Sequence, residues 1–433
     1  EGLSNAGEMG TNLIIVVNDN EMSIAENHGG LYQNLKELRD TEGRSSCNFF
    51  RSLGLDYLYV GEGNDIPSLV AAFAKVKDTS RPTVVHIHTQ KGKGYAPAEA
   101  DREEFHWEMP FDLETGKPKV DCSGMEDYHS LTGKFLLEKM KEDHTVVAIS
   151  SGTPTVIGFT PERRKQAGRQ FVDVGIAEEH AVALASGIAA GGGRPVYGVY
   201  STFVQRCYDQ LSQDLCINGN PAVITVFMGT VAGMNDVTHL GFFDIPLISN
   251  IPNMVYLAPT CSEEYFAMLE WAVRQTEYPV AIRVPGAAVV HRKEEFDTDY
   301  SELNRYKMTA RGETVAILAL GAFYDLGQAL KNKLREESGV EATLINPRYI
   351  TGLDEPMLEE LKVGHRIVVT LEDGVLDGGF GEKIARYYGN SEMRVLNYGL
   401  RKEFADRYNL DELMKANRLT DKQMAEDIAG ILG

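Results

Sequence analysis

The sequence predicts an α/β protein built from three parallel-sheet domains. Short apolar, β-branched segments alternate with longer amphipathic ones along the chain, which is the pattern of strands joined by crossover helices. The chain has 433 residues, too many for a single ordinary core. Its hydrophobic fraction of 43% and its 42 glycines are typical of globular α/β proteins.

The first predicted domain covers residues 1–124. The segment Asn12–Val17 has the composition of a central buried strand, and Thr83–His88 is a second predicted strand. Each is followed by a polar turn, and such strand ends are where open α/β sheets bind ligands. A central parallel strand needs a neighbour on both sides, so we expect further residues before Glu1 in the natural protein.

The second predicted domain covers residues 125–305 and the third residues 306–433. Every strand in both is expected to be parallel to its neighbours, because helices separate consecutive strands. The second has predicted strands at Thr145–Ser150, Phe171–Val174, Pro195–Tyr200, Ala222–Met228, Met254–Ala258 and Val280–Val284, and helices at Val204–Ile217 and Ser262–Gln275. The third has predicted strands at Thr314–Leu320, Glu341–Asn346, Arg366–Leu371 and Arg394–Asn397, a helix at Tyr324–Glu337, and helical residues from Leu410 onward.

Composition excludes some classes of partner. The formal net charge of −20 argues against nucleic acid and anionic membranes, and it requires a local cation wherever an anionic substrate binds. No apolar run approaches the length of a membrane span. The five cysteines are scattered without metal-site spacing, which predicts reduced thiols and a cytoplasmic protein.

The most informative stretch runs from Phe171 to Ala190. A short strand turns at Gly175 into an Ala-rich helix whose first turn holds Glu178 and Glu179. Because the rest of that helix is apolar, Glu178 is expected at the edge of a buried interior, where its pKa is raised and it can exchange protons near neutral pH. The alternative is that both carboxylates only complement the helix dipole.

Two polar turns in the first domain have the composition of ligand-binding loops. Asn18-Asp-Asn20-Glu-Met22 collects oxygen donors of the kind that Mg²⁺ prefers, although spacing alone favours an Asx turn. Lys91-Gly-Lys93-Gly places ammonium groups and backbone N–H groups together, as a phosphate site does. A flexible surface turn explains the second motif equally well.

The second domain offers further candidates at strand ends. Tyr200, Phe203 and Arg206 follow one strand, and core packing is the simpler explanation for Phe203. Arg206 near a helix N-terminus needs an anionic partner, either Asp209 or a substrate phosphate. His239 closes a glycine-containing loop and is available for proton transfer, although a lone loop histidine is often incidental.

Taken together, these stretches resemble the 1-deoxy-D-xylulose-5-phosphate synthase family, which is related to transketolase and uses thiamine diphosphate. The most specific segments are Val17-Asn-Asp-Asn-Glu-Met-Ser-Ile24, Lys91-Gly-Lys-Gly-Tyr-Ala-Pro-Ala-Glu99, Asp173-Val-Gly-Ile-Ala-Glu-Glu-His180 and Tyr200-Ser-Thr-Phe-Val-Gln-Arg206. Their order and spacing together carry the resemblance, which runs from residue 1 to about residue 400. It implies three domains of the thiamine-diphosphate-binding type, in a homodimer.

The resemblance also implies a reaction and a set of site residues. Pyruvate would be decarboxylated and its two-carbon unit joined to glyceraldehyde 3-phosphate, in isoprene and thiamine biosynthesis. Glu178 would bond N1′ of the cofactor pyrimidine and promote deprotonation of the thiazolium carbon. The other implied roles are catalysis by His106 and His239, cofactor binding by Phe203, Lys91 and Ile176, substrate binding by Tyr200, Arg206 and Asn235, and Mg²⁺ binding by Asn20 and the backbone of Met22.

The chain departs from the family pattern in places. The family's Gly-Asp-Gly element, which supplies a Mg²⁺ ligand, would lie about thirty residues before Asn20, the length of a strand-to-strand crossover. That position falls before Glu1. Met228 and Gly286 stand where the pattern has arginines for the acceptor's phosphate, and Asn235-Asp236 stands where it has Asp-Gly. We therefore expect weaker dependence on that phosphate. The alternatives are a transketolase-like enzyme with another acceptor aldehyde, and a non-catalytic fragment or partner subunit.

Overall fold

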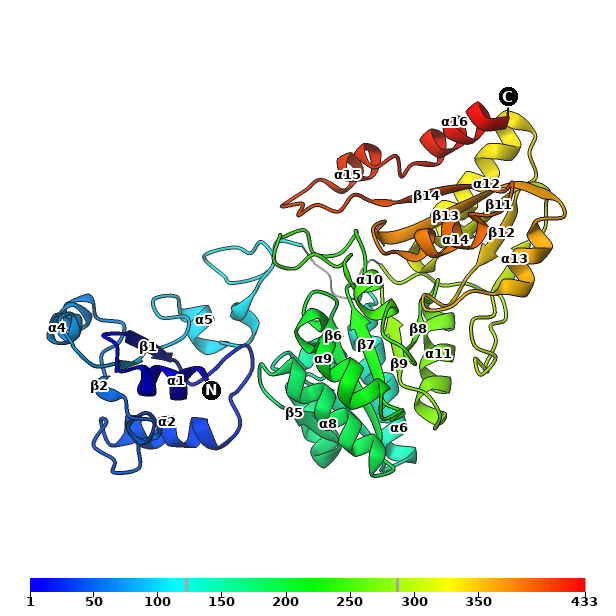
Figure 1. Ribbon diagram of the computed structural model, residues 1–433. Coiled ribbons are helices and arrows are strands. Elements are labelled where there is room, and N and C mark those ends of the chain that lie inside the picture. The colour runs from blue at the N-terminus through cyan, green and yellow to red at the C-terminus, as the bar shows by residue number, and fades with distance from the viewer. Residues whose placement is uncertain (121–123, 286–287, 433) are drawn as a thin grey trace. The chain divides into compact units, whose positions relative to one another are not determined.

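The computed structural model describes residues 1–120, 124–285 and 288–432 (Figure 1). The chain divides into two compact units, Glu1–Met125 and Glu126–Gly433. The predicted α/β class is confirmed, because each unit consists of sheets with strands that alternate with helices along the chain. Among the described residues, no helix combines the length and the apolar character needed to cross a bilayer.

The first unit holds a three-stranded parallel sheet in the order β1-β3-β2. The prediction for residues 12–17 was wrong in one respect: β1 is an edge strand of this sheet, and Val16 is 47% exposed. The central strand is β3, which is buried along most of its length. The elements are β1 (Ile14–Asp19), β2 (Asp56–Val60), β3 (Thr83–His88), α1 (Gly2–Met9), α2 (Gly30–Asp40), α3 (Phe49–Ser52), α4 (Ile66–Val76), α5 (Ala96–Ala100) and the 3-10 turn η1 (Glu104–His106).

The second unit begins with a six-stranded parallel sheet in the order β5-β4-β6-β7-β9-β8. All six strands lie where the sequence predicts them. They are β4 (Val146–Ser150), β5 (Phe171–Asp173), β6 (Arg194–Tyr200), β7 (Val223–Phe227), β8 (Val255–Leu257) and β9 (Val280–Arg283). The α-helices between and around them are α6 (Tyr128–Glu142), α7 (Pro161–Ala167), α8 (Glu178–Ala190), α9 (Tyr208–Gln210), α10 (Asp244–Ser249) and α11 (Ser262–Arg274).

The helix predicted at residues 204–217 is not one regular helix. It begins as a 3-10 turn, η4 (Val204–Cys207), passes through α9, and ends as a π-helix, η5 (Leu211–Cys216). Leu211 and Leu215 on this segment are buried in the core beside α8. The changes of helical pitch alter the direction of the side chains at its start, which include Arg206.

The second unit also contains a five-stranded sheet in the order β10-β12-β11-β13-β14. The expectation of parallel strands throughout was wrong here, because β10 runs antiparallel to β12 at the edge. The strands are β10 (Lys307–Ala310), β11 (Thr314–Ala319), β12 (Thr343–Asn346), β13 (His365–Val375) and β14 (Arg394–Leu400). The helices are α12 (Tyr324–Ser338), α13 (Glu355–Leu361), α14 (Phe380–Tyr388), α15 (Leu410–Ala416) and α16 (Asp421–Leu432).

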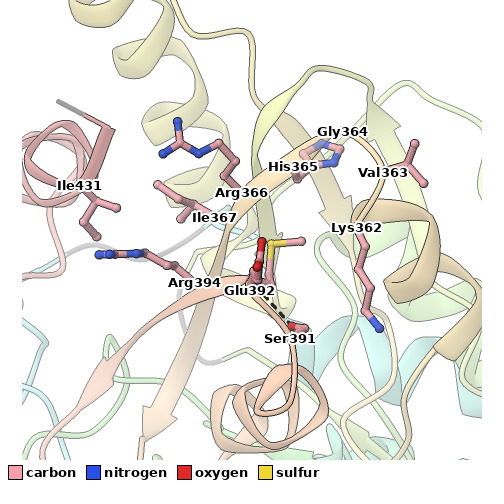
Figure 2. A pocket seen from close by; sticks show the side chains of 11 residues that line it. Lys362, Val363, Gly364, His365, Arg366, Ile367, Ser391, Glu392, Arg394 and Ile431 are labelled. Atoms are coloured by element: carbon pink, nitrogen blue, oxygen red, sulfur yellow. Dashed lines mark hydrogen bonds between the residues drawn. The ribbon is translucent and has the colours of Figure 1, made fainter.

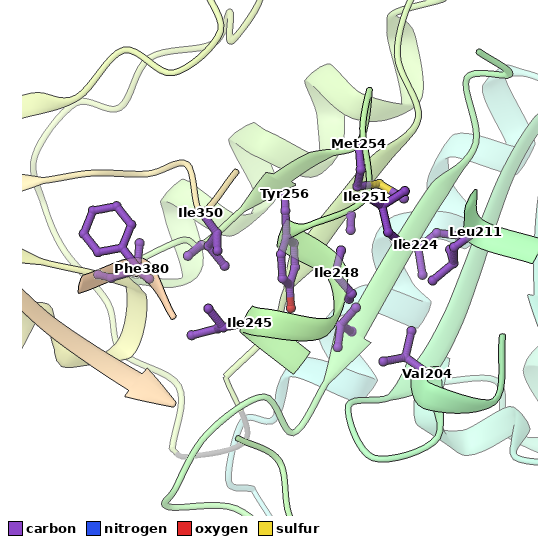
Figure 3. Close-up of a cluster of buried hydrophobic side chains, with 14 of the residues drawn as sticks. Val204, Leu211, Ile224, Ile245, Ile248, Ile251, Met254, Tyr256, Ile350 and Phe380 are labelled. Atoms are coloured by element: carbon purple, nitrogen blue, oxygen red, sulfur yellow. The ribbon is translucent and has the colours of Figure 1, made fainter. Parts of the chain in front are cut away.

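One apolar core joins these two sheets. It includes Ile224 and Tyr256 from the six-stranded sheet, and Ile350 and Phe380 from the C-terminal part (Figure 3). Arg283 at the end of β9 lies beside this core, where Asp244 and Asp373 pair with it. The continuous packing explains why residues 126–433 form one compact unit although they hold two sheets.

Candidate functional site

The carboxylate of Glu178 is buried at the first residue of α8. After β5 ends, Oδ1 of Asp173 accepts hydrogen bonds from the backbone N–H groups of Gly152 and Gly175, which shapes the turn into the helix. Glu178 is 3% exposed, and its Oε2 has no hydrogen-bond partner among the described residues. Burial raises the pKa of Glu178, and the nearby Arg206 partly opposes that shift. The structure therefore supports an acid that holds its proton more tightly than an exposed glutamate does.

Arg206 is the cation that faces this acid. Its Nε lies 3.2 Å from Oε2 of Glu178, without the geometry of a hydrogen bond, and its Nη2 lies 3.9 Å from Oε2 of Glu179. The sequence predicted Asp209 or a substrate phosphate as the partner. Within the described residues Glu178 and Glu179, not Asp209, face Arg206, and the phosphate stays a prediction. The segments after β5 and β6 leave the same edge of the sheet on either side of β4, which brings Arg206 to the start of α8.

Three of the predicted side chains of the second unit form a row of rings. The rings of Tyr200 and Phe203 meet edge to face at 6.0 Å, and those of Phe203 and His239 at 5.4 Å. Nδ1 of His239 shares a 2.7 Å hydrogen bond with the Thr238 hydroxyl. Phe203 also packs against the apolar core, as the simpler explanation for this residue expects.

Sequence reasoning missed a fourth ring in the row. His129, in the first turn of α6, lies edge to face with Tyr200 at 6.2 Å and stacks on Phe227 at 4.8 Å. About 70 residues of chain separate it from Tyr200, and a single polar residue in a first helical turn has no periodicity to identify it. Only the tertiary structure reveals these contacts, which His129 makes with the last residues of β6 and β7.

Two other predicted residues have different surroundings. Ile176, in the turn before α8, is 50% exposed. The side-chain amide of Asn235 donates to the backbone carbonyl oxygen of Tyr408 in the C-terminal part. The backbone carbonyl oxygen of Asn235 accepts from the backbone N–H of Arg407. The contacts of Asn235 are thus to the C-terminal part of the chain, not to the row of rings.

The oxygen-rich turn after β1 adopts the Asx-turn geometry that its spacing favours. Oδ1 of Asp19 accepts from the N–H of Glu21, and Oδ1 of Asn20 accepts from the N–H of Met22. Nζ of Lys91 donates to the carbonyl oxygens of Ser23 at 2.7 Å and Ile24 at 3.3 Å. Lys91 therefore holds the segment that follows the turn.

The ionisation of residues in the first unit is set by close contacts. Burial lowers the pKa of Lys91. Burial and the charge of Lys91 lower the pKa of His106, which ends the turn η1. Burial alone would raise the pKa of Asp19, but hydrogen bonds from His86 and Arg39 bring it down to about 2. The first unit thus keeps His106 neutral and Asp19 charged near pH 7.

Of the two positions where the family pattern has an arginine, the structure describes Met228 but not Gly286. Met228, directly after β7, is half-buried and has a positive φ of 57°. Its carbonyl oxygen accepts from the N–H of Thr230. Gly286 lies outside the described residues.

Cys122 also lies outside the described residues. The other four cysteines are free thiols, as predicted.

One cavity of about 620 Å³ lies elsewhere in the second unit. It is lined mainly by the starts of β13 and β14, with the side chains of Arg366, Arg394 and Glu392 around it (Figure 2). This is the amino end of those strands, whereas ligands of open α/β sheets bind at the carboxyl ends. None of the residues predicted for the site lines this cavity.

Comparison with known families identifies the parts of the chain. The profile of the transketolase pyrimidine-binding domain matches residues 126–289, and that of the transketolase C-terminal domain matches residues 305–424. The profile of the N-terminal part of 1-deoxy-D-xylulose-5-phosphate synthase matches residues 1–47.

Similar proteins cover nearly the whole chain. A 1-deoxy-D-xylulose-5-phosphate synthase from Lachnoclostridium phytofermentans is 33% identical over 98% of this chain and 74% of its own length. One from Clostridium beijerinckii is 33% identical over 97% of this chain and 73% of its own.

Solved structures share the fold at lower sequence identity. A transketolase from Pichia stipitis superposes with a TM-score of 0.58 at 16% identity, over 99% of this chain and 74% of its own. A chain described as a split-gene transketolase, an inactive beta4 tetramer, gives a TM-score of 0.59 at 21% identity, over 70% of this chain and 96% of its own.

Proposed function

The chain belongs to the 1-deoxy-D-xylulose-5-phosphate synthase family, and we propose that it joins a two-carbon unit from pyruvate to glyceraldehyde 3-phosphate with loss of carbon dioxide. Members of this family are thiamine-diphosphate-dependent transferases. The observation that carries the proposal is the buried carboxylate of Glu178, whose Oε2 has no hydrogen-bond partner among the described residues. A buried acceptor without a donor is costly, so it is expected where a ligand completes it.

The residues around Glu178 fit the pyrimidine end of the cofactor. A pyrimidine ring offers an apolar face and a nitrogen that shares a proton. Phe203 supplies a half-buried aromatic face, and Glu178 supplies a buried acid with a raised pKa. Glu178 would hold and return a proton at the ring nitrogen, while Phe203 and the exposed Ile176 would contact the ring. When bound, thiamine diphosphate supplies the electron sink for the negative charge left by decarboxylation.

The turn after β1 fits the diphosphate end through its oxygen donors. Oδ1 of Asn20 is oriented by the N–H of Met22 and keeps a second lone pair, and the carbonyl oxygen of Met22 is a further hard donor. The described residues contain no group of three or more His, Cys, Asp or Glu side chains placed to hold a metal. The described part of this turn would offer a Mg²⁺ ion the amide oxygen of Asn20 and the carbonyl oxygen of Met22. Lys91 would orient the turn and contribute positive charge.

The remaining predicted residues would serve the substrates. Tyr200 and His239 lie on the row of rings next to Phe203, where a substrate on the cofactor would react. His239 would transfer protons to the reacting oxygen. His106, whose pKa is lowered by burial, stays a predicted catalytic histidine. Arg206 would release Glu178 when it binds an anionic group. The acceptor contact of Asn235 stays a prediction, because its amide is bonded to Tyr408 in this structure.

A product assay tests this function. The native protein would be incubated with pyruvate, glyceraldehyde 3-phosphate, thiamine diphosphate and Mg²⁺, and the products identified by mass spectrometry. We expect carbon dioxide and 1-deoxy-D-xylulose 5-phosphate in equal amounts, and no product when the cofactor is omitted. Pyruvate that remains unconsumed in the complete mixture would contradict the proposal. The expected homodimer, the bound magnesium and the cytoplasmic location stay predictions.

A further inference from the structure

The row of rings ends in an imidazole on each side, and the two imidazoles share one arrangement. In His129 and in His239, Nδ1 is committed to a hydrogen bond within the protein. Nε2 of each ring has no hydrogen-bond partner among the described residues, and the same is true of the Tyr200 hydroxyl between them. A row of aromatic faces with three uncommitted polar atoms has the composition of a site for a small polar molecule.

The protonation state of His129 follows from its partner. Nδ1 lies 2.7 Å from the carbonyl oxygen of Val156, and a carbonyl oxygen can only accept, so Nδ1 carries the hydrogen. Burial lowers the pKa of His129, against smaller opposing effects from its hydrogen bond to Val156 and from the charge of Asp127. The ring is therefore neutral at pH 7, and its Nε2 presents a lone pair. A lone pair of this kind accepts a hydrogen bond from a hydroxyl group.

The ring of His129 is held in place from two directions. It stacks on Phe227, the last residue of β7, with an interplanar angle of 19°, while the bond to Val156 fixes its rotation. The helix that carries it is anchored at the same turn, where Oδ1 of Asp127 accepts from the N–H of Ser130. Such an imidazole is already ordered before a ligand arrives, which reduces the entropy lost on binding.

We propose that His129 is an acceptor-binding residue that recognises a hydroxyl group of the aldehyde substrate through the lone pair on Nε2. This rests on the proposed function, because it assigns a role within the acceptor half of that reaction. Glyceraldehyde 3-phosphate carries one such hydroxyl, on the carbon next to its aldehyde.

The surroundings of His129 favour a hydroxyl over a phosphate as its ligand. Met228, which follows the stacked Phe227, adds no charge. The nearby guanidinium of Arg163 is already committed to the carbonyl oxygens of Ser130 and Gly158 and to the Ser130 hydroxyl. Nε2 of a neutral imidazole, with no uncommitted cation beside it, gains little from a phosphate dianion. It can accept a hydrogen bond from an alcohol.

The test compares two acceptors that differ by one hydroxyl. Steady-state kcat/KM would be measured for glyceraldehyde 3-phosphate and for 3-oxopropyl phosphate, which lacks the hydroxyl next to the aldehyde. The variants are His129→Phe, which keeps the stacked ring and removes Nε2, and His129→Gln, which places an amide near the position of Nε2. His144→Phe, at an exposed histidine before β4, is the matched control. Release of carbon dioxide from pyruvate without an acceptor reports the donor half separately.

We expect His129→Phe to lower kcat/KM for glyceraldehyde 3-phosphate about tenfold, which corresponds to the loss of one neutral hydrogen bond. The kcat/KM for 3-oxopropyl phosphate should stay unchanged. His129→Gln should restore part of the loss, and His144→Phe should change neither value. An equal loss for both acceptors, or no loss, would overturn the assignment. If the wild-type protein releases no carbon dioxide from pyruvate in the complete mixture with the acceptor, the proposed function fails and this inference with it. Intact release with unchanged acceptor preference refutes the inference alone.

Discussion

Nε of Arg206 lies 3.2 Å from Oε2 of Glu178, yet the geometry leaves that oxygen without a hydrogen bond. Charge attraction without directional bonding is weaker than a bidentate pair, and the Arg206 side chain is 47% exposed. The guanidinium can therefore move aside at little cost. A ligand that donates to Oε2 would then complete the hydrogen bonding of the buried acid.

The first prediction concerns the acid itself. Glu178→Gln keeps the shape of the side chain but cannot exchange a proton, so we expect acceptor-independent release of carbon dioxide from pyruvate to fall by about 10²–10⁴-fold. Glu179→Gln, in the same helical turn, is the control and should retain most of the activity. Thermal unfolding should show both variants folded. Normal turnover in Glu178→Gln would remove this residue from its role.

The second prediction concerns pH. The folded-state pKa of Glu178 is raised by burial, so the folded protein binds a proton more tightly at this site than the unfolded chain does. The stabilisation of the folded state by this tighter proton binding is fully present below the ordinary glutamate pKa of about 4.3. It is lost as pH rises through the folded-state pKa of Glu178. The melting temperature of Glu178→Gln relative to wild type should thus increase between pH 4 and pH 8.

Arg206→Met should enlarge that pH-dependent difference. It removes the charge that opposes the raised pKa of Glu178 while keeping an apolar side chain of similar length. The measurement is the melting temperature of Arg206→Met and of the double variant Arg206→Met/Glu178→Gln across the same pH range. If the pH-dependent difference between these two is no larger than that between wild type and Glu178→Gln, Arg206 does not act on the ionisation of Glu178.

The third prediction concerns the first unit. Asp19 is buried, pairs with Arg39, and has Oδ2 2.9 Å from Nε2 of His86. Its pKa of about 2 lies below the ordinary value of about 3.9, so it contributes stability above that value, lost as pH falls towards 2. The contribution at pH 7 is about 2–3 kcal/mol. Asp19→Asn should lose most of it in denaturant unfolding, whereas Asp40→Asn, at the exposed Lys36 pair, should change stability little.

The fourth prediction concerns the contact between the two sheets of the second unit. Nε of the buried Arg283 lies 2.8 Å from Oδ2 of Asp244, and its Nη2 donates to the carbonyl oxygen of Asp373. Arg283→Met leaves two buried carboxylates without their cation, and we expect a loss of about 3–5 kcal/mol in denaturant unfolding. Arg274→Met removes a mostly exposed arginine that pairs with Glu270 and should cost less than about 1 kcal/mol. Equal effects would contradict the importance of the buried network.

Several features of the fold and the site could be predicted from the sequence. The strands of the six-stranded sheet are apolar and short, and each was placed within about two residues of its position. The Asx turns after β1 follow from local side-chain chemistry. The antiparallel strand β10 was missed because its four residues, Lys307–Ala310, have no apolar run and pair with a strand more than thirty positions away.

The sequence alone determined that this is an α/β protein of one recognisable family, with an acid at the head of an Ala-rich helix. These are properties of local order: hydrophobic period, turn chemistry and motif spacing. Only the tertiary structure decided that Arg206 faces Glu178 and that His129 joins the row of rings. Those relationships depend on which loops leave the same edge of a sheet. Residues distant along the chain meet there through packing of the strands and helices between them, and no local pattern in the sequence records such a contact.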